Sequence, residues 1–441
     1  MSHVSQAASS LPPASRREIA AWALYDFANS GYTTVVLTAV YNAYFVAVIA
    51  GSDAGFGAGS GTFLWTVTVA IANGLVLLTA PLLGAMADHG AHKKRFLLVT
   101  TLGCAGFTAL LGLAGPGEVL GAMLLVIGSA YLFSTGENLI AAFLPEIAPP
   151  ERMGRISALG WAVGYVGGVL VLGLCLAYLF WAKGQGHTAE QYVPVILLIV
   201  AVIFVLAALP TFLWLRERAV PSDFQPGRLG LYFSEGWRRV AGTLHHARHF
   251  RDLFRFLLTL LLYHSGIATV VVLAAVYARE EMGFGQSDTI LLILLVNITA
   301  AIGAYLFGRI QDRLGSLPTL AVTLVIWIAA ILLAFLAQGP VHFWIAANLV
   351  GIAMGSSQSA GRALIGQFTP PARTAEFFGL WGLAVKLAAI VGPVSYGLIG
   401  YLSGGNHRLA ILSTMGFFIA GLVSLWGIDE QRGRRAAGEQ A

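Results

Sequence analysis

The sequence has few charged residues and almost no cysteine. Asp, Glu, Lys and Arg make up 11% of its 441 residues, whereas soluble domains carry about 25%. Apolar residues make up 57%, and the mean hydropathy is +0.77. So small a charged fraction excludes a soluble globular protein and is typical of a chain that crosses a membrane many times.

Other absences narrow the function. The two cysteines, Cys104 and Cys175, both fall in apolar stretches, so we expect no disulfide framework. The polar N-terminus lacks the apolar core of a removable signal peptide. The net charge of +5 is spread over many short loops, which does not favour a nucleic-acid partner. Nucleotide-binding loops, HExxH and His/Cys clusters at metal spacing are missing. We therefore expect neither an enzyme nor a bound metal or cofactor.

Twelve apolar stretches are long enough to cross a bilayer, because a helix needs about 20 apolar residues to span about 30 Å of hydrocarbon. They are residues 20–47, 63–86, 96–114, 119–143, 155–181, 192–215, 256–278, 288–309, 317–337, 341–366, 376–402 and 408–427. We expect an all-α membrane protein of twelve transmembrane helices, with the first and eleventh tilted or broken.

The positive charges indicate the orientation. With the N-terminus inside, 22 of the 26 Lys and Arg residues fall on the cytoplasmic side. Lys183, Arg279 and Arg408 fall on the other side, and Lys386 lies within a span. Because positively charged loops stay in the cytoplasm, we expect both termini there. The short loops favour a bacterial inner-membrane protein.

The chain divides into two similar halves. "GAMADHGAHKKR" after the second span and "GRIQDRLG" after the eighth both place Asp four residues after Gly. A Pro-Pro pair and a Trp recur before the fifth and eleventh spans at nearly the same offset. We expect a six-helix bundle over 1–215, a cytoplasmic linker with an amphipathic helix over 216–255, a second bundle over 256–428 and a tail over 429–441.

Two six-helix pseudo-repeats form the architecture of major facilitator transporters, and the chain resembles that superfamily over nearly its whole length. Gly84, Asp88 and Arg95 in the second-to-third loop resemble its signature. The repeated positions are Gly308, Asp312 and Arg313. The resemblance implies that these six residues control conformation rather than bind substrate.

A narrower resemblance involves longer segments. "WALYDFANSGYTTVVLTAVYNAYF" in the first span and "AAFLPEIAPPERMGRISALGWAVGYVGG" around the fifth are similar to the vacuolar-effluxer-like branch of the superfamily. "GSSQSAGRALIGQF" and "EFFGLWGLAVKLAAIVGP" at the tenth and eleventh spans are similar to it too. The resemblance implies a secondary transporter, with small amino acids as the favoured substrates.

In that fold the first, fourth, seventh and tenth helices line a central cavity. Each carries one ionisable residue within its span: Asp26, Glu137, His264 and Arg362. Lys386 on the eleventh span adds a fifth. Burying a charge at the bilayer centre costs about 3 kcal/mol on insertion scales, so such residues usually face a wet cavity or a partner.

Two interpretations of these charges remain open. In the first, Asp26 or Glu137 carries a coupling proton while Arg362 or Lys386 holds an anionic group such as a substrate carboxylate. Neutral hydrogen bonds would come from four amide side chains: Asn29, Asn138, Asn348 and Gln358. In the second, Arg362 forms a structural ion pair with Asp26 or Glu137 that closes the cytoplasmic gate.

The sequence thus favours a secondary active transporter that works as a monomer by alternating access. Proton coupling, as a symporter or an antiporter, is a hypothesis that rests on Asp26 and Glu137. His264 either titrates near neutral pH or is a hydrogen-bonded packing residue. A drug, a sugar or another metabolite is the alternative substrate. A membrane receptor or a membrane-embedded acyltransferase is the alternative from another class. The expected partners are a small molecule, protons and the lipid bilayer.

Overall fold

A computed structural model of the chain describes residues 13–51, 60–89, 92–218, 250–403 and 406–438. This part of the chain is helical almost throughout and contains no strand. The long helices of the first half are α2 (Arg16–Tyr32), α4 (Ser60–His89), α5 (Lys93–Leu110), α6 (Val119–Ala141), α8 (Met153–Gly184) and α9 (Ala189–Trp214). Those of the second half are α11 (Arg251–Met282), α12 (Gln286–Leu314), α13 (Ser316–Leu336), α14 (Pro340–Gln367), α15 (Thr374–Leu402) and α16 (His407–Leu425).

Eleven helical segments among the described residues are long and apolar enough to cross a membrane. The twelfth long helix, α14, is not among them. Its 28 residues are enough to span a bilayer, but amide, hydroxyl and guanidinium side chains lower its hydropathy. It packs against α12, α13 and α8 inside the bundle, where polar side chains face other helices rather than lipid. The expected all-α fold of twelve helices is confirmed.

The first span is irregular in its second half. α2 begins at a capping box in which the Ser15 hydroxyl and the Glu18 carboxylate each accept a backbone N–H. After Tyr32 the chain continues as a π-helix over Thr33–Ala39, a short α3 (Tyr41–Tyr44) and a second π-helix over Phe45–Ile49. The eleventh span, by contrast, is one helix, α15, with Pro393 inside it.

The helix contacts repeat between the halves. In the first half α2 packs on α8 and α9, α4 packs on α6, and α5 packs on α6 and α9. The matching pairs of the second half are α11 with α15 and α16, α12 with α14, and α13 with α14 and α16. The halves meet where α4 contacts α15 and α8 contacts α12, which is a reciprocal exchange of equivalent helices.

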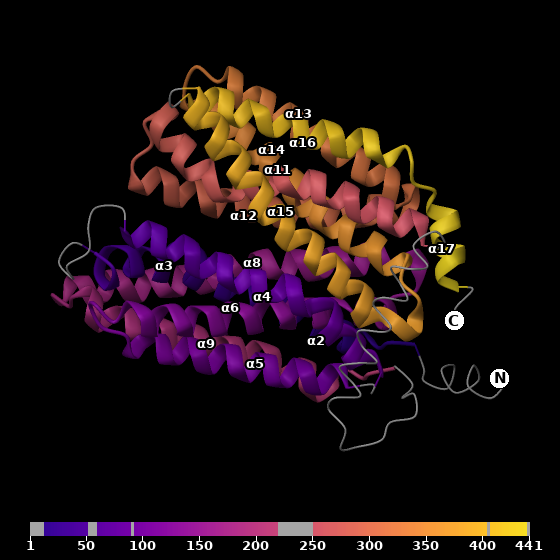
Figure 1. The fold of residues 1–441 in the computed structure, drawn as a ribbon, viewed down its shortest axis with the longest axis horizontal. Helices are drawn as coiled ribbons and strands as arrows, with labels where there is room; N and C mark the ends of the chain where they lie inside the picture. The colour runs from indigo at the N-terminus through magenta and orange to yellow at the C-terminus, as the bar shows by residue number, and fades with distance from the viewer. Residues whose placement is uncertain (1–12, 52–59, 90–91, 219–249, 404–405, 439–441) are drawn as a thin grey trace.

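Both ends of the described chain lie at the same end of the bundle (Figure 1). We call this end, where α2 begins and α16 ends, the terminal face. A further helix, α17 (Glu430–Gly438), lies there within the predicted tail. The amphipathic helix expected in the linker falls largely on residues 219–249, outside the described part of the chain.

Candidate functional site

A buried ion pair joins the two halves. Asp26 on α2 accepts a hydrogen bond from the Arg362 guanidinium on α14, with 2.7 Å between Oδ2 and Nη1. Asp26 is 9% exposed and Arg362 is 4% exposed. The other two guanidinium nitrogens donate to Ser157 on α8, Nε to Oγ at 3.2 Å and Nη2 to the carbonyl at 2.8 Å. All three nitrogens of the guanidinium are therefore engaged by the first half.

Aromatic rings complete the surroundings of the guanidinium. Its carbon lies 4.7 Å from the ring centre of Trp22 and 5.2 Å from that of Trp161. Such contacts between a cation and an aromatic face are attractive, more so when water is excluded. The Trp22 indole also donates to the Ile140 carbonyl of α6 at 2.8 Å, which fixes α2 one turn before Asp26.

Small residues on α8 make room for the pair. A Cβ at Gly160 would contact the Asp26 carboxylate and lie 2.6 Å from Arg362 Nη2 and 2.7 Å from the Trp22 ring. A Cβ at Gly164 would lie 3.0 Å from the Ser30 hydroxyl. The row of glycines on this helix therefore lets α2 and α8 approach closely, as small residues do between membrane helices.

A second, looser ion pair links α6 with α15. Glu137 Oε2 and Lys386 Nζ are 3.9 Å apart, which is longer than a hydrogen bond. Their side chains are 30% and 15% exposed. The charges of Asp26 and Arg362 also act on Glu137, so the two pairs are neighbours. The amide of Asn138 lies over Gly382 of α15, where any Cβ would clash with it.

Several of the expected polar residues hold buried atoms with no hydrogen-bond partner among the described residues. They are Asn29 Oδ1, Asn138 Nδ2 and His264 Nδ1. His264 lies close enough to Lys386 for their charges to interact. Gln358 differs, because its side-chain oxygen accepts a hydrogen bond from the Tyr165 hydroxyl across the two halves. Buried polar atoms without a protein partner usually meet water or a ligand.

The expected conformational residues lie at the terminal face. Asp88, at the end of α4, accepts a hydrogen bond from the Glu376 backbone N–H at 2.9 Å, in the first turn of α15. Gly84, one turn earlier, lies against the Ala375 carbonyl so closely that no Cβ would fit. A carboxylate at a helix N-terminus is stabilised by the unpaired N–H groups and by the helix dipole.

The second copy of this motif makes the reciprocal contact. Asp312 of α12 accepts a hydrogen bond from the Arg155 backbone N–H at 3.1 Å, in the first turn of α8. Gly308 lies against Ala158 of the same helix. Each half thus caps a helix of the other half. Arg95 and Arg313 are exposed, and the structure gives neither a hydrogen bond within the described residues.

Lys93, rather than Arg95, is the buried cation of the motif. It is fully buried, donates to the Glu146 carboxylate and to the Thr374 hydroxyl at 2.7 Å, and lies 3.5 Å from Asp88. Glu217, at the start of the linker, accepts the backbone N–H of Lys93 at 2.8 Å. Burial raises the pKa of Glu217, whereas the hydrogen bonds from the start of α5 lower it. The linker is therefore anchored to the same cluster.

The hydrogen bonds that the structure shows between the two halves lie on the terminal side of the bundle. The deepest of them, at Tyr165, is 12 residues from the start of α8, a helix of 32 residues. Gln367, the last residue of α14, reaches the Pro150 carbonyl at 3.3 Å. Within the described residues the two halves are thus held together at their terminal side.

Sequence reasoning missed several residues of this arrangement. Ser157, Trp22 and Trp161 surround Arg362, and Glu146 and Thr374 hold Lys93. Nothing in their spacing marks a serine or a tryptophan in a membrane helix as a partner of a distant arginine. The one available signal was that Trp161, before the fifth span, has an equivalent in the second half, Trp381. Among the described residues, no group of three or more His, Cys, Asp or Glu side chains could hold a metal ion.

Comparison with known proteins places the chain in a family. The family model described as "Vacuole effluxer Atg22 like" matches residues 61–438. An uncharacterised MFS-type transporter of Bacillus subtilis (strain 168), YxiO, is 27% identical, over 93% of this chain and 94% of that protein. Autophagy-related protein 22 of Coccidioides immitis (strain RS) is 24% identical, over 86% of this chain and 74% of that protein.

A solved structure shares the fold. The major facilitator proton:xylose symporter XylE superposes with a TM-score of 0.72 at 14% sequence identity, over 96% of this chain and 98% of that one. The family match, the membrane-spanning helices and the shared fold lead to one conclusion. The chain belongs to the Atg22-like vacuole effluxer family and is an integral membrane transporter of the major facilitator type.

Proposed function

We propose that this transporter moves small amino acids by alternating access, coupled to protons, and that it does so as a monomer in a bacterial inner membrane. The terminal face is cytoplasmic in this proposal, since 22 of the 26 Lys and Arg residues fall on that side of the predicted topology. The described conformation is then the one closed towards the cytoplasm. Transport requires the halves to separate there and to meet at the opposite face.

The proposal rests on a difference between the Asp26–Arg362 ion pair and the Glu137–Lys386 ion pair. Arg362 uses each of its three guanidinium nitrogens on the first half and is only 4% exposed, so it holds the gate rather than a substrate. Lys386 and Glu137 are 3.9 Å apart and partly exposed within the bundle. Because neither charge is saturated by the other, this pair can exchange its weak mutual contact for contacts with a ligand.

A zwitterion matches such a pair. Its carboxylate would contact Lys386 and the unpartnered Asn138 Nδ2, and its ammonium would contact Glu137. The description of the family as vacuole effluxers supports transport of a cellular solute, and the amino-acid class rests on resemblance to the fungal branch. Protonation of Asp26 would remove the charge that holds Arg362 and so favour opening of the terminal side.

The test is uptake of radiolabelled amino acids into proteoliposomes of the pure protein, with and without an imposed pH gradient. Lys386→Gln should raise KM roughly ten- to hundredfold, because a hydrogen bond to a charged group contributes about 1.5–3 kcal/mol. Asp26→Asn should abolish stimulation by the gradient. Lys183→Gln, which changes an exposed cation at the opposite face, is the matched control.

An unchanged KM in Lys386→Gln would show that this residue does not bind the substrate. Gradient stimulation that survives in Asp26→Asn would leave Asp26 as a gate residue only. If the wild-type protein transports no amino acid, the amino-acid class is wrong, and the same assay is then run with sugars and with cationic drugs.

A further inference from the structure

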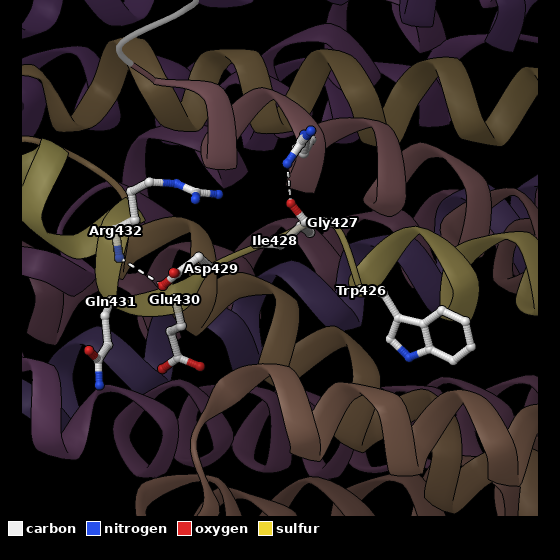
Figure 2. A pocket seen from close by; sticks show the side chains of 8 residues that line it. Trp426, Gly427, Ile428, Asp429, Glu430, Gln431 and Arg432 are labelled. Carbon is white, nitrogen blue, oxygen red and sulfur yellow. Dashed lines mark hydrogen bonds between the residues drawn. The ribbon is translucent and has the colours of Figure 1, made fainter.

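A recess lies at the terminal face of the second half, apart from the central ion pairs. It has a volume of about 680 Å³ and is lined by Arg255 of α11 and by residues 426–432, which form the connection after α16 and the first turn of α17. Figure 2 shows the indole of Trp426 at one side of the recess, with Glu430, Gln431 and Arg432 at the other. Its lining is mainly polar, so it is not an unfilled part of the apolar core.

The recess contains a cation with donors to spare. Arg255 donates one hydrogen bond, from Nη1 to the Gly427 carbonyl, which fixes the guanidinium at the wall. The structure gives it no other hydrogen bond among the described residues, and an arginine carries five N–H donors. Arg251, one helical turn earlier on the same face of α11, is exposed and has no carboxylate partner in the described part of the chain.

The acidic residues around the recess are already committed to hydrogen bonds. Asp252 accepts from Arg432 Nε at 2.6 Å and Nη2 at 2.7 Å, and from the Asp429 N–H at 2.9 Å. Asp429 caps the start of α17 by accepting the Arg432 N–H at 3.0 Å. Glu430 accepts the N–H groups of Ser316 and Leu317, at the start of α13, both at 3.1 Å. Arg255 feels the charge of Asp252 but donates no hydrogen bond to a carboxylate among the described residues, and neither does Arg251.

Trp426 places the recess at the level of the lipid headgroups. It directly follows α16, which crosses the membrane, and it is 85% exposed. Tryptophan is enriched at the boundary between hydrocarbon and water, where its ring lies among glycerol and headgroup atoms. An arginine with free donors beside an exposed interfacial tryptophan therefore faces phospholipid rather than open water.

We propose that this recess binds the phosphodiester group of an anionic phospholipid. Arg255 donates to the phosphate oxygens, Arg251 contributes charge from the neighbouring turn, and Trp426 lies against the glycerol and the first part of the acyl chains. Guanidinium groups suit phosphate because they present several donors in one plane. The site is independent of the substrate and of the direction of transport.

Quenching of Trp426 fluorescence by brominated phosphatidylglycerol tests the proposal. The lipid is titrated into the full-length protein in detergent, and the difference between wild type and Trp426→Phe isolates this one indole. We expect saturable quenching. Arg251→Gln/Arg255→Gln should raise the half-saturating concentration roughly thirtyfold, given the usual contribution of a cation near an anionic surface. Lys183→Gln should leave it unchanged, and Arg255→Lys should retain part of the affinity.

Three outcomes would overturn the proposal. Equal quenching by brominated phosphatidylcholine would show that negative charge is not recognised. An unchanged half-saturating concentration in a double variant that still elutes as a folded monomer would remove the arginines from the site. Displacement of the lipid by millimolar inorganic phosphate would identify a soluble phosphate rather than a phospholipid as the ligand.

Discussion

At the scale of single residues, Gly160 decides whether the central ion pair can form. Asp26, Arg362 and Trp22 occupy the space where its side chain would lie. Gly160→Ala should therefore destabilise the described conformation by about 1–3 kcal/mol, as overpacking of a tight core does. Thermal unfolding in detergent and the transport rate together measure the effect.

The same helix provides the control for that change. Gly173 is exposed, and a Cβ there would meet nothing within 4 Å. Gly173→Ala should leave transport intact and stabilise the protein slightly, by about 0.5–1 kcal/mol, because alanine suits a helix better than glycine. If both variants behave alike, the crowding around Gly160 has no energetic consequence.

At the scale of helices, the two aspartate caps have equivalent positions but differ in the charged groups beside them. Asp88 is buried and lies 3.5 Å from the Lys93 ammonium, whereas Asp312 is half-buried and has no lysine at the equivalent position, where Leu317 stands. Asp88→Asn should therefore loosen the terminal side more than Asp312→Asn does. A lost cap costs about 1 kcal/mol, and the loss of its ionic contacts adds to that.

Labelling of a buried cysteine reports this loosening. Ser359 is 1% exposed, and its hydroxyl has no hydrogen-bond partner among the described residues, so Ser359→Cys is a mild reporter substitution. Asp88→Asn should raise its rate of maleimide labelling roughly five- to tenfold, in proportion to the lost free energy. Equal rates in the two aspartate variants would mean that Lys93 contributes nothing to closure.

The C-terminal helix α17 makes a contribution to stability that can be measured. Arg434 Nη2 donates to Gln367 at 3.0 Å, and Gln367 in turn donates to Pro150 of the first half. Glu430 caps α13 as described above. Deleting 430–441 should lower the free energy of unfolding by about 2–4 kcal/mol, since the cap of α13 and the charged hydrogen bonds of Arg432 and Arg434 are lost. Arg435 is exposed and makes no hydrogen bond within the described part of the chain, so Arg435→Gln should change nothing in the same thermal unfolding assay.

The sequence predicted where the helices lie along the chain better than it predicted which helices contact one another. Apolar length places twelve spans, and the repeated Gly and Asp mark the loops that approach the other half. Spacing along the chain cannot say which helix faces which. The sequence therefore allowed Arg362 to pair with either Asp26 or Glu137, and the structure selects Asp26 because Ser157 and the two tryptophans complete that pocket. The residues of the second half of the first span do not predict that it forms π-helix.

At the scale of the whole molecule, the remaining question is which side of the membrane the terminal face occupies. The excess of positive charge there predicts the cytoplasm. Two exposed positions lie at opposite faces: Gln185, between α8 and α9, and Arg435, on α17. Both native cysteines are buried, so an introduced cysteine is labelled against a low background.

Intact cells then distinguish the two orientations. With Gln185→Cys, a membrane-impermeant maleimide should label the protein without permeabilisation. With Arg435→Cys, labelling should appear only after the membrane is opened. The reverse pattern would place the closed side of the bundle outside the cell. In that case protons and substrate would enter the central site from the cytoplasm in the described conformation, and Asp26 would gate the exit to the exterior instead of the entry to the cytoplasm.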